Sequence, residues 1–368
     1  MQTCIMLIKD MDKYYTIGQA AKILGVSQET LRRWDNSGKF KSLRHPMNNY
    51  RVYSDNQIQN LVQDIQLDCF YKPVNLIKEE IKPFFQTDLG DLYNCDCIDF
   101  LKELESNSVD LIFADPPYNI KKAEWDVFDS QKDYLDWTME WIREAQRVLT
   151  KRGSMYICGF SEILADIKYI SSPYFKGCRW LVWYYRNKAN LGKDWGRSHE
   201  SILHFRKSND FIFNIDAVRI PYNEHTTRYP KRTQAETSQY SNGKNNKKYE
   251  WEPNPLGAKP KDVLEIPTIS NGAWEKFAHE TQKPVELLRK IILSSSNEDS
   301  YILDPFGGSG TTFAVAEAYN RKWIGIEKEL NYCQVIKQRL SDKTHIARIS
   351  SAKDEEESQI RRKNLRLK

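Results

Sequence analysis

The sequence predicts an α/β protein with a mostly parallel sheet, an antiparallel sheet edge and a small helical domain in front of it. From Thr87 to Asp342, apolar strand-like runs alternate with amphipathic helical runs, which indicates a parallel sheet covered on both faces. Three consecutive strand-like runs, "RWLVWYYRNK", "SILHFRK" and "DFIFNI", predict the antiparallel edge. Two short capped helices joined by a turn at Gly25 predict the helical domain.

Composition indicates a globular protein of more than one domain. The chain has 368 residues, of which 40% are hydrophobic and 29% charged. No apolar run reaches the ~18 residues of a membrane span, and the start is a poor secretory signal. The seven cysteines form no CxxC pair, which argues for reduced thiols and against a disulfide framework or a zinc site. We therefore expect a cytoplasmic protein that binds neither a membrane nor a metal; the resemblance described below implies a prokaryotic or phage source.

The N-terminal domain is predicted at residues 1–70. Thr16 is a plausible cap for a helix over "IGQAAKIL", and Ser27 caps a second helix over "QETLRRWDNS". Asn48 and Asn49 then lie between basic and aromatic residues, as at the tip of a β-hairpin. Eight Lys or Arg residues against two acids between Lys13 and Tyr53 suit contacts with phosphates and bases.

This order resembles the winged helix-turn-helix of the MerR family, on "TIGQAAKILGVSQETLRRWDNSGKF" followed by "NNYRVYS". In that family the second helix enters the major groove of DNA and the wing contacts the backbone. The resemblance implies groove contacts from Gln28, Thr30, Arg32 and Arg33, and wing contacts from Arg51 and Tyr53. A helical appendage that mediates dimer contacts is the alternative.

A glycine-rich loop, "DPFGGSGTT", ends one predicted strand and opens a helix at Asp304 to Thr312. Glycines there allow a ligand to approach the backbone, and the helix N-terminus favours an anionic group. The loop matches neither a Walker loop nor the dinucleotide pattern. The next strand finishes at Glu327, where an acid would hold a ribose hydroxyl pair. S-adenosylmethionine fits a cofactor with a ribose and a small anionic end.

Three motifs in order, "ADPPYNI", "HETQKPVELL" and "LDPFGGSGTT", resemble the DNA amino-methyltransferases of the β arrangement over residues 88–340. The resemblance implies a Rossmann-like S-adenosylmethionine-dependent methyltransferase fold and transfer of a methyl group to the N6 amino group of adenine in double-stranded DNA. In the tetrad, Asp115 and the carbonyl of Pro116 would each accept one amine hydrogen. Pro117 would stiffen the corner, and Tyr118 would stack on the flipped base.

The resemblance also implies a set of cofactor-binding residues. Glu280 stands where the family usually has proline, and Cys95 stands where glycine is common. Asp304 is expected to order the loop more than to contact the ligand, and Phe306 to stack on the cofactor or fill the core. The set is Asp96, His279, Thr281, Lys283, Asp304, Phe306, Gly308, Ser309, Gly310, Thr311 and Glu327.

The predicted order along the chain is a linker at 71–86, a methyltransferase domain at 87–342 and a charged tail at 343–368. A target-recognition region is expected at about 219–270, because nine bases against four acids lie between Arg219 and Lys261. Arg219, Arg228, Lys231 and Arg232 are expected to contact phosphates or bases.

Alternatives to adenine methylation are N4-cytosine methylation and a DNA-binding regulator with an inactive methyltransferase fold. The first residue of the tetrad favours adenine, because cytosine members of the family more often begin it with serine. Relatives of this arrangement are often dimers, so a homodimer is expected from the resemblance. The biological setting would be restriction-modification, with a cognate restriction endonuclease as partner, or an orphan or phage methylase.

Overall fold

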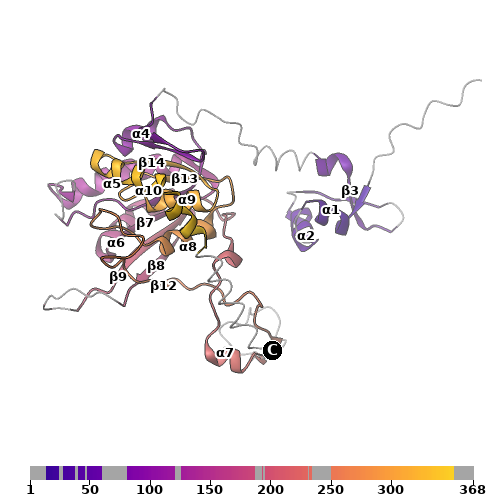
Figure 1. The fold of residues 1–368 in the computed structure, drawn as a ribbon. Helices are drawn as coiled ribbons and strands as arrows, with labels where there is room; N and C mark the ends of the chain where they lie inside the picture. Colours follow the sequence, from indigo (N-terminus) through magenta and orange to yellow (C-terminus); the bar gives the residue numbers. More distant parts are fainter. Residues whose placement is uncertain are drawn as a thin grey trace, which may run out of the picture. The chain divides into compact units, whose positions relative to one another are not determined.

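The computed structural model describes residues 14–24, 28–37, 40–45, 48–59, 81–120, 126–186, 193, 195–230, 232–233 and 250–351. The chain forms two compact units, Met1–Asn75 and Leu76–Lys368 (Figure 1). Within the described ranges, no helix is both long enough and apolar enough to cross a bilayer.

In its described residues the first unit combines helices α1 (Ile17–Ile23) and α2 (Gln28–Ser37), and a further helical segment at 55–59, with a small antiparallel sheet. Helices α1 and α2 lie against strands ordered β1 (Tyr14–Thr16), β3 (Arg51–Ser54) and β2 (Leu43–Arg44). Thr16 caps α1 in a capping box with Gln19, as its position before the apolar run predicts. Asn49 adopts a left-handed φ of 57° between β2 and β3, which fits the expected hairpin tip. The buried apolar side chains among the described residues of this unit are Ala20, Ala21, Leu31, Phe40, Tyr53 and Ile58.

The second unit is built on one nine-stranded sheet, in the order β12-β8-β9-β7-β6-β13-β14-β5-β4. Five neighbouring strands from β7 to β5 run parallel, whereas β9 is antiparallel to both β7 and β8, and β4 is antiparallel to β5. The sheet is therefore mostly parallel with antiparallel edges, as the sequence predicts. The strands are β4 (Phe85–Gln86), β5 (Gly90–Tyr93), β6 (Val109–Ala114), β7 (Leu149–Gly159), β8 (Gly177–Tyr184), β9 (His199–Arg206), β12 (Val263–Glu265), β13 (Tyr301–Asp304) and β14 (Lys322–Ile326).

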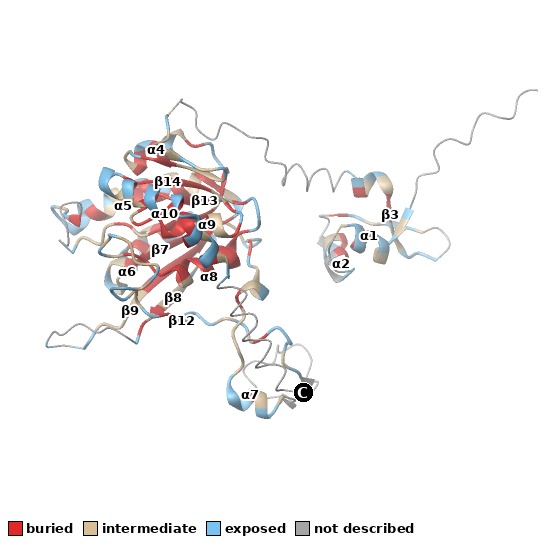
Figure 2. Cartoon of the chain, viewed as in Figure 1, coloured by how far each residue is buried: buried red, intermediate tan, exposed pale blue. Residues whose placement is uncertain are grey.

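Helices cover both faces of this sheet. In β6, Leu111 and Phe113 pack into one apolar cluster while Ile112 and Ala114 pack into the other, because successive side chains of a strand point to opposite faces. Buried residues accordingly concentrate in the central strands and on the inner sides of the helices (Figure 2). The first cluster includes α8 (Val285–Ser295), α9 (Thr311–Ala318) and α10 (Leu330–Ser341), and the second α4 (Cys97–Glu103), α5 (Gln131–Val148) and α6 (Ser161–Ser171).

Two segments differ from the sequence-based expectation. The run "DFIFNI" forms no strand; the chain turns at Ser208, and Phe211 packs against the guanidinium of Arg206 at 4.9 Å from its ring centroid. Residues 343–351 are helical, and Ile349 is fully buried in the first cluster. The packed unit therefore extends into the predicted charged tail, because Ile346 and Ile349 both pack with the first cluster.

Beyond the central sheet, the chain between β9 and β12 contains a 3₁₀ helix (Ile215–Val218), the helix α7 (Glu224–Arg228) and a strand pair, β10 (Arg232–Thr233) with β11 (Glu250–Trp251). Much of this region, residues 234–249, lies outside the described residues.

The buried His204 of β9 should make the stability of the second unit depend on pH. Its ring stacks on Tyr156 with centroids 4.2 Å apart, and its Nε2 atom is 3.1 Å from the hydroxyl of Ser154. Burial, with a smaller contribution from Arg206, lowers the pKa of His204 from 6.5 to about 3. The unfolded chain therefore binds a proton near pH 6.5 that the native unit binds only at far lower pH.

We predict that the second unit loses stability as the pH falls from 6.5 toward 3, with His204 contributing up to about 1.4 kcal/mol per pH unit. His204→Gln removes this titration and should flatten the dependence by that amount. Urea unfolding of both proteins at pH 7, 6, 5 and 4 measures the difference. Equal slopes in the wild type and the variant would show that His204 does not titrate differently in the two states.

Candidate active site

The candidate site lies where the parallel strands of the large sheet have their C-terminal ends, which we call the site edge. Because parallel strands share their direction, this is where β6, β13, β14 and β5 all end. β9 runs the opposite way and therefore begins there, with Ser201 paired to Gly159 at the end of β7. The chain leaves β6 toward β7 and leaves β13 toward β14, so the strand order reverses between β6 and β13. Such a reversal is where open α/β sheets bind ligands.

The residues after β6 form a fixed corner. The hydroxyl of Tyr134 donates to the carbonyl oxygen of Pro117 at 2.9 Å. Asn119 takes a left-handed φ of 56°, and its amide donates to Asp126 at 2.6 Å. Asp126, which the sequence analysis missed, also accepts from the amide of Ile120 at 3.1 Å. A hydrogen bond from α5 thus holds the tetrad at 115–118, and the carboxylate of Asp126 holds the residues that follow it.

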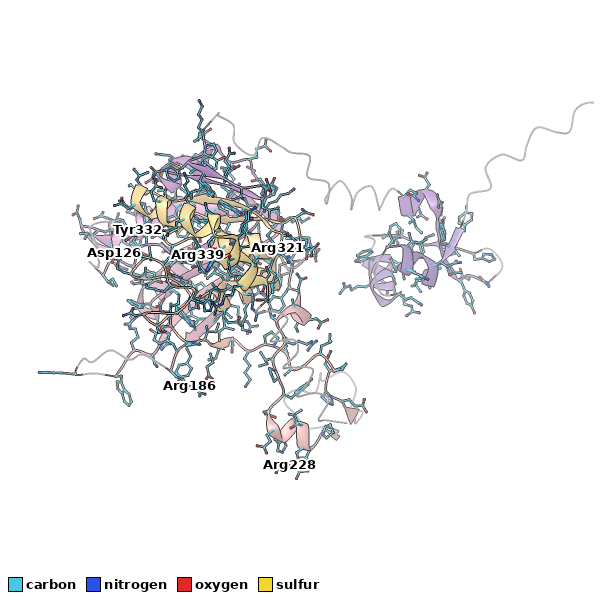
Figure 3. The ribbon with its side chains drawn as sticks, viewed as in Figure 1. Asp126, Arg186, Arg228, Arg321, Tyr332 and Arg339 are labelled. Carbon is cyan, nitrogen blue, oxygen red and sulfur yellow. The ribbon has the colours of Figure 1, made fainter. Side chains whose placement is uncertain are left out.

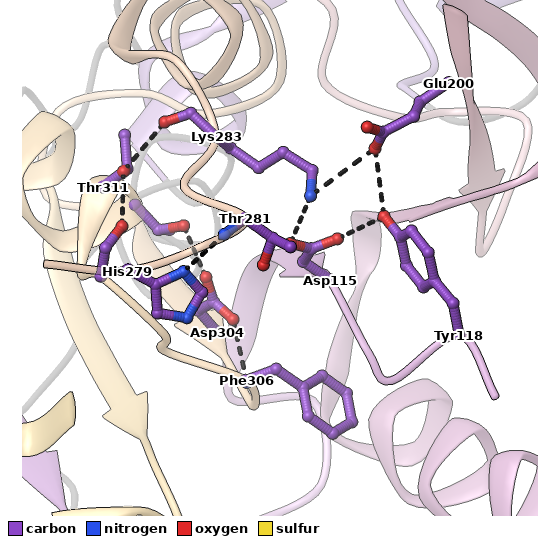
Figure 4. A network of polar contacts seen from close by, with 11 residues as sticks. Asp115, Tyr118, Glu200, His279, Thr281, Lys283, Asp304, Phe306 and Thr311 are labelled. Atoms are coloured by element: carbon purple, nitrogen blue, oxygen red, sulfur yellow. Dashed lines mark hydrogen bonds and ion pairs between the residues drawn. The ribbon is translucent and has the colours of Figure 1, made fainter. Parts of the chain in front are cut away.

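Three polar side chains converge on the Asp115 carboxylate or its immediate neighbours (Figure 4). The ammonium of Lys283 donates to Asp115 Oδ2 at 2.5 Å, and the hydroxyl of Tyr118 donates to Asp115 Oδ1 at 2.6 Å. The second acceptor in this group is Glu200, at the start of β9. Its Oε2 atom is 3.2 Å from the Tyr118 hydroxyl and 3.6 Å from the Lys283 ammonium.

Glu200 was not among the predicted site residues. In the sequence it stands at the beginning of an apolar run, "HESILHFR", and nothing in the run itself shows which edge of the sheet it reaches. Only the reversed direction of β9 brings it to Asp115. The signal that could have identified Glu200 is an acidic residue at the start of a strand that begins beside the site.

The electrostatics of this group favour a charged lysine. Burial alone would lower the pKa of Lys283, but the carboxylates of Asp115 and Glu200 outweigh burial and raise that pKa above its ordinary value. Burial also raises the pKa of Tyr118 well above 10, and both carboxylates add to that rise. Lys283 is therefore a cation and Tyr118 a neutral hydrogen-bond donor at neutral pH.

The glycine loop connects β13 to α9 and is ordered by Asp304. One oxygen of this buried carboxyl accepts from the amide of Phe306 at 3.0 Å, and the other accepts from the hydroxyl of Thr312 at 2.5 Å. Burial raises the pKa of Asp304 well above its ordinary value. These contacts agree with its expected role in ordering the loop. The Phe306 ring is partly buried and packs edge-on against Trp141 at 5.3 Å, beside the second apolar cluster; both of its expected roles stay predictions.

Two glycines of the loop could not carry a side chain without strain. Gly308 and Gly310 have φ of 51° and 73°, in the left-handed region. A Cβ atom on Gly308 would lie 3.1 Å from His279 Nε2. The amide of Gly308 donates to Glu327 Oε2 at 2.7 Å, which joins the loop to the end of β14. The carboxylate of Glu327 keeps lone pairs beyond this bond and the one from Glu329, so it can also accept from ribose hydroxyls.

A buried arginine that the sequence analysis missed supports the loop from behind. Arg339, labelled in Figure 3, belongs to α10 and is fully buried. Its Nη1 atom donates to the carbonyl of Ser309 at 3.1 Å and to the hydroxyl of Thr311 at 2.8 Å. Burial lowers the pKa of Arg339 to about 9. Its periodic place on an amphipathic helix gives no sign of this role.

The remaining predicted cofactor residues also lie around this edge. His279 Nδ1 accepts from the amide of Thr281 at 3.2 Å, and burial lowers the pKa of His279 to about 4, so the ring is neutral at pH 7. Asp96 caps α4 by accepting from the amide of Ile98 at 2.9 Å, and it lies 3.3 Å from the ammonium of Lys328. The shaped glycine loop, the acid ending β14 and the neutral histidine fit the groups that S-adenosylmethionine presents.

The predicted DNA contacts of the first unit fall into two classes. Arg32 and Arg33 are exposed on α2, as is Gln28, whereas the side chain of Thr30 is outside the described residues. Tyr53, by contrast, is fully buried, and its ring stacks on Phe40 at 5.1 Å. Tyr53 is therefore a core residue, and the prediction that it contacts DNA from a wing is wrong.

Arg51 contacts the buried Asp35 at 2.6 Å and donates to Asn36 at 3.2 Å, so its guanidinium connects β3 to α2. Burial alone would raise the pKa of Asp35, but the Ser42 amide and Arg51 outweigh it and lower that pKa to about 2. Arg51 therefore stabilises the packing of β3 against α2 within the first unit.

The predicted contacts of the target-recognition region also divide. Arg219 is largely buried, pairs with Asp216 at 2.6 Å and donates to the carbonyl of Gly257 at 3.0 Å, so it ties two segments of the region together. Arg228 is exposed on α7, where it pairs with Glu224 at 2.9 Å (Figure 3). Lys231 and the side chain of Arg232 lie outside the described residues.

Comparison with known proteins adds the family to this geometry. The family described as DNA methylase matches residues 109–338, and the MerR family of regulatory proteins matches residues 16–53. Type II methyltransferase M1.MboII of Moraxella bovis is 36% identical over 252 residues, covering 67% of this chain and 94% of that protein. DNA adenine methyltransferase YhdJ of Escherichia coli (strain K12) is 34% identical over 275 residues, covering 73% of this chain and 88% of that protein.

The solved structure of PvuII DNA methyltransferase (cytosine-N4-specific) has the same fold, with a TM-score of 0.53 at 20% identity, covering 76% of this chain and 96% of that one. The family match extends over more than half of the chain and includes the corner after β6, Lys283, the glycine loop and Glu327. The chain therefore belongs to the DNA methylase family, whose members are S-adenosylmethionine-dependent DNA methyltransferases.

Proposed function

We propose that the protein methylates the N6 amino group of adenine at a specific sequence in double-stranded DNA. The observation that carries this proposal is the Asp115 carboxylate, which stands at the end of β6 with Tyr118 hydrogen-bonded to it at 2.6 Å. A carboxylate accepts hydrogen bonds without donating any, as an amino group with two hydrogens requires.

The exocyclic nitrogen of adenine is a weak nucleophile, because its lone pair is delocalised into the ring. Under the proposal, Asp115 accepts one amine hydrogen and the carbonyl of Pro116 accepts the other, so the nitrogen can become pyramidal as it attacks. These acceptors act most strongly as positive charge develops on nitrogen, which is preorganised electrostatic stabilisation. When bound, S-adenosylmethionine supplies the electrophilic methyl group. The methylated amine then sheds its proton readily, so no general base with a shifted pKa is required.

The target base must leave the duplex to reach Asp115. We propose that Tyr118 offers its ring as the stacking surface, since that ring already makes an edge contact with Phe160 at 5.1 Å. On the cofactor side, Glu327 would hold the ribose and Asp96 would approach the adenine of the cofactor. Gly308, Ser309, Gly310 and Thr311 would border the cofactor, with His279, Thr281 and Lys283 near its methionine end.

Adenine is preferred to cytosine on two grounds. Members of the family that methylate cytosine more often begin the tetrad with serine, whereas this chain has Asp115. A relative named as a DNA adenine methyltransferase is 34% identical over 73% of the chain. N4-cytosine methylation remains the second candidate, because its target is also an exocyclic amine and the same acceptors would serve it.

We further propose that the first unit is a MerR-like winged helix-turn-helix that contacts DNA. The support is the family match at residues 16–53 and the two arginines, Arg32 and Arg33, exposed on α2. Assembly of a homodimer is the alternative role for this unit. A cognate endonuclease, as in restriction-modification, is the partner that the Type II relative M1.MboII suggests.

The decisive test of the proposed function is the identity of the product. DNA from cells that express the protein is sequenced for methylated bases, which yields the target sequence. Purified protein then transfers tritiated methyl groups to an unmethylated duplex of that sequence, and the nucleosides are analysed. We expect N6-methyladenine. N4-methylcytosine would establish the sister chemistry, and DNA binding without transfer would establish a regulator.

Asp115→Ala should lower the rate of methyl transfer by about 100-fold or more, the scale expected when one preorganised electrostatic contact is lost. Binding of S-adenosylmethionine, followed by calorimetry, should persist. The matched control is Asp136→Ala on the exposed face of α5, which should retain the wild-type rate. Persistence of near-wild-type transfer in the folded, cofactor-binding Asp115→Ala protein would contradict the proposed role of the carboxylate.

Replacing Arg32 and Arg33 together by alanine tests the first unit. If both contact phosphates, the slope of log binding constant against log salt concentration should become shallower by about 1.8, or about 0.9 for each contact. The slope is measured by fluorescence anisotropy with a labelled duplex at about 50–300 mM salt, where the affinity depends strongly on salt. Lys132→Ala, an exposed charge on α5, is the control. An unchanged slope, together with an altered oligomeric state, would assign the unit to assembly.

A further inference from the structure

The acceptor that the reaction needs is fully engaged in the structure. Asp115 Oδ1 accepts from the Tyr118 hydroxyl at 2.6 Å, and Asp115 Oδ2 accepts from the Lys283 ammonium at 2.5 Å. The Lys283 side chain is buried, and that of Asp115 is 17% exposed, so little water reaches this pair. An incoming amino group therefore meets a carboxylate with a hydrogen-bond donor on each oxygen.

This occupation works against the proposed chemistry. A carboxylate oxygen has room for a second donor, but an ammonium at 2.5 Å already withdraws negative charge from it and crowds the approach. For the amine hydrogen to be held firmly, at least one of the two existing donors must loosen its bond to Asp115. A buried donor that lets go needs another acceptor nearby, because a buried unpaired ammonium or hydroxyl is strongly unfavourable.

Glu200 is that acceptor for both donors. Its Oε2 atom lies 3.2 Å from the Tyr118 hydroxyl and 3.6 Å from the Lys283 ammonium (Figure 4). The first distance is within hydrogen-bonding range, but the single hydroxyl hydrogen of Tyr118 is donated to Asp115, so it reaches Glu200 only when the bond to Asp115 is released. The second is an ion pair that a small side-chain movement converts into a hydrogen bond. Each donor is therefore within reach of Glu200 but lies closer to Asp115, with which it makes the shorter contact.

We propose that Glu200 is a positioning residue that receives the Lys283 ammonium and the Tyr118 hydroxyl when the target amino group engages Asp115. The proposal rests on the proposed function, since it explains how the site becomes free for an amine. No bond is made or broken covalently in this exchange; two hydrogen bonds move from one carboxylate to the other. The charge of the group, two carboxylates and one ammonium, is unchanged by it.

The exchange requires a carboxylate at position 200 for a physical reason. A glutamine could accept from Tyr118, but its neutral oxygen could not balance the charge of Lys283 once that ammonium leaves Asp115. Lys283 would then remain on Asp115 and compete with the substrate. A glutamine should therefore leave the folded site in place and slow the step in which the target amine is held.

The test uses the full chain and the duplex whose sequence the wild-type protein methylates in cells. Single-turnover rates at saturating S-adenosylmethionine are compared for the wild type, Glu200→Gln, Glu200→Asp and the control Glu162→Gln, an exposed acid on α6. The dissociation constants for S-adenosylmethionine and for the duplex are measured in parallel. We expect Glu200→Gln to lose about 10- to 100-fold in rate, the scale of one hydrogen bond to a charged group. Both dissociation constants should stay within about threefold, which is under about 0.7 kcal/mol.

The Glu200→Asp variant and a double-variant comparison with Lys283 distinguish a positioning role from a purely structural one. Glu200→Asp keeps the charge and should recover part of the rate that Glu200→Gln loses. If Glu200 acts through Lys283, the double variant Glu200→Gln/Lys283→Gln should be no slower than Lys283→Gln alone, because the two effects are then not additive.

The outcomes are distinct. A wild-type rate in Glu200→Gln would overturn the inference. So would a loss of rate that is accompanied by a lower melting temperature and weaker binding of S-adenosylmethionine, because the variant would then have damaged the fold. Additive losses in the double variant would overturn it as well. Failure of the wild-type protein to methylate any duplex would instead overturn the proposed function on which the inference rests.

Discussion

Lys283 is the residue on which the architecture of the site depends, because it contacts both halves of it. Its ammonium pairs with Asp115 at the corner after β6, and its backbone carbonyl accepts from the hydroxyl of Thr311 at 3.1 Å, at the start of α9. One residue therefore fixes the position of the Asp115 carboxylate relative to the glycine loop. The ion pair is buried, so its geometry is maintained by a strong and weakly screened interaction.

The sheet makes this convergence available. Parallel strands deliver their final residues to one edge, which gathers the tetrad, the glycine loop and Glu327 although they are far apart in the sequence. The reversed strand β9 adds its first residues to the same edge, and Glu200 enters the site in this way. The antiparallel part of the sheet thus contributes to the chemistry as well as to the fold.

Local chemistry made much of this predictable from the sequence. A strand that ends in Asp-Pro-Pro-Tyr and a loop rich in glycine carry their constraints in their own residues, so the edge of the sheet and the order of its motifs were predicted. Glu200, Asp126 and Arg339 were missed because their roles arise from contacts over 82, 7 and 30 positions in the chain, without a local pattern. Tyr53 was misassigned for the converse reason: an aromatic residue beside an arginine suits a surface wing equally well as a core, and burial decides between them.

Arg339 has a consequence for the order in which the protein becomes competent. Its guanidinium fixes the glycine loop through Ser309 and Thr311, yet it belongs to α10, the last labelled helix of the chain. During synthesis, domains fold from the N-terminal side as the chain emerges from the ribosome. A nascent chain that has completed both the tetrad and the glycine loop still lacks the brace behind that loop. The contacts behind the glycine loop therefore form only after α10 has been made, later than the segments that we propose to contact DNA.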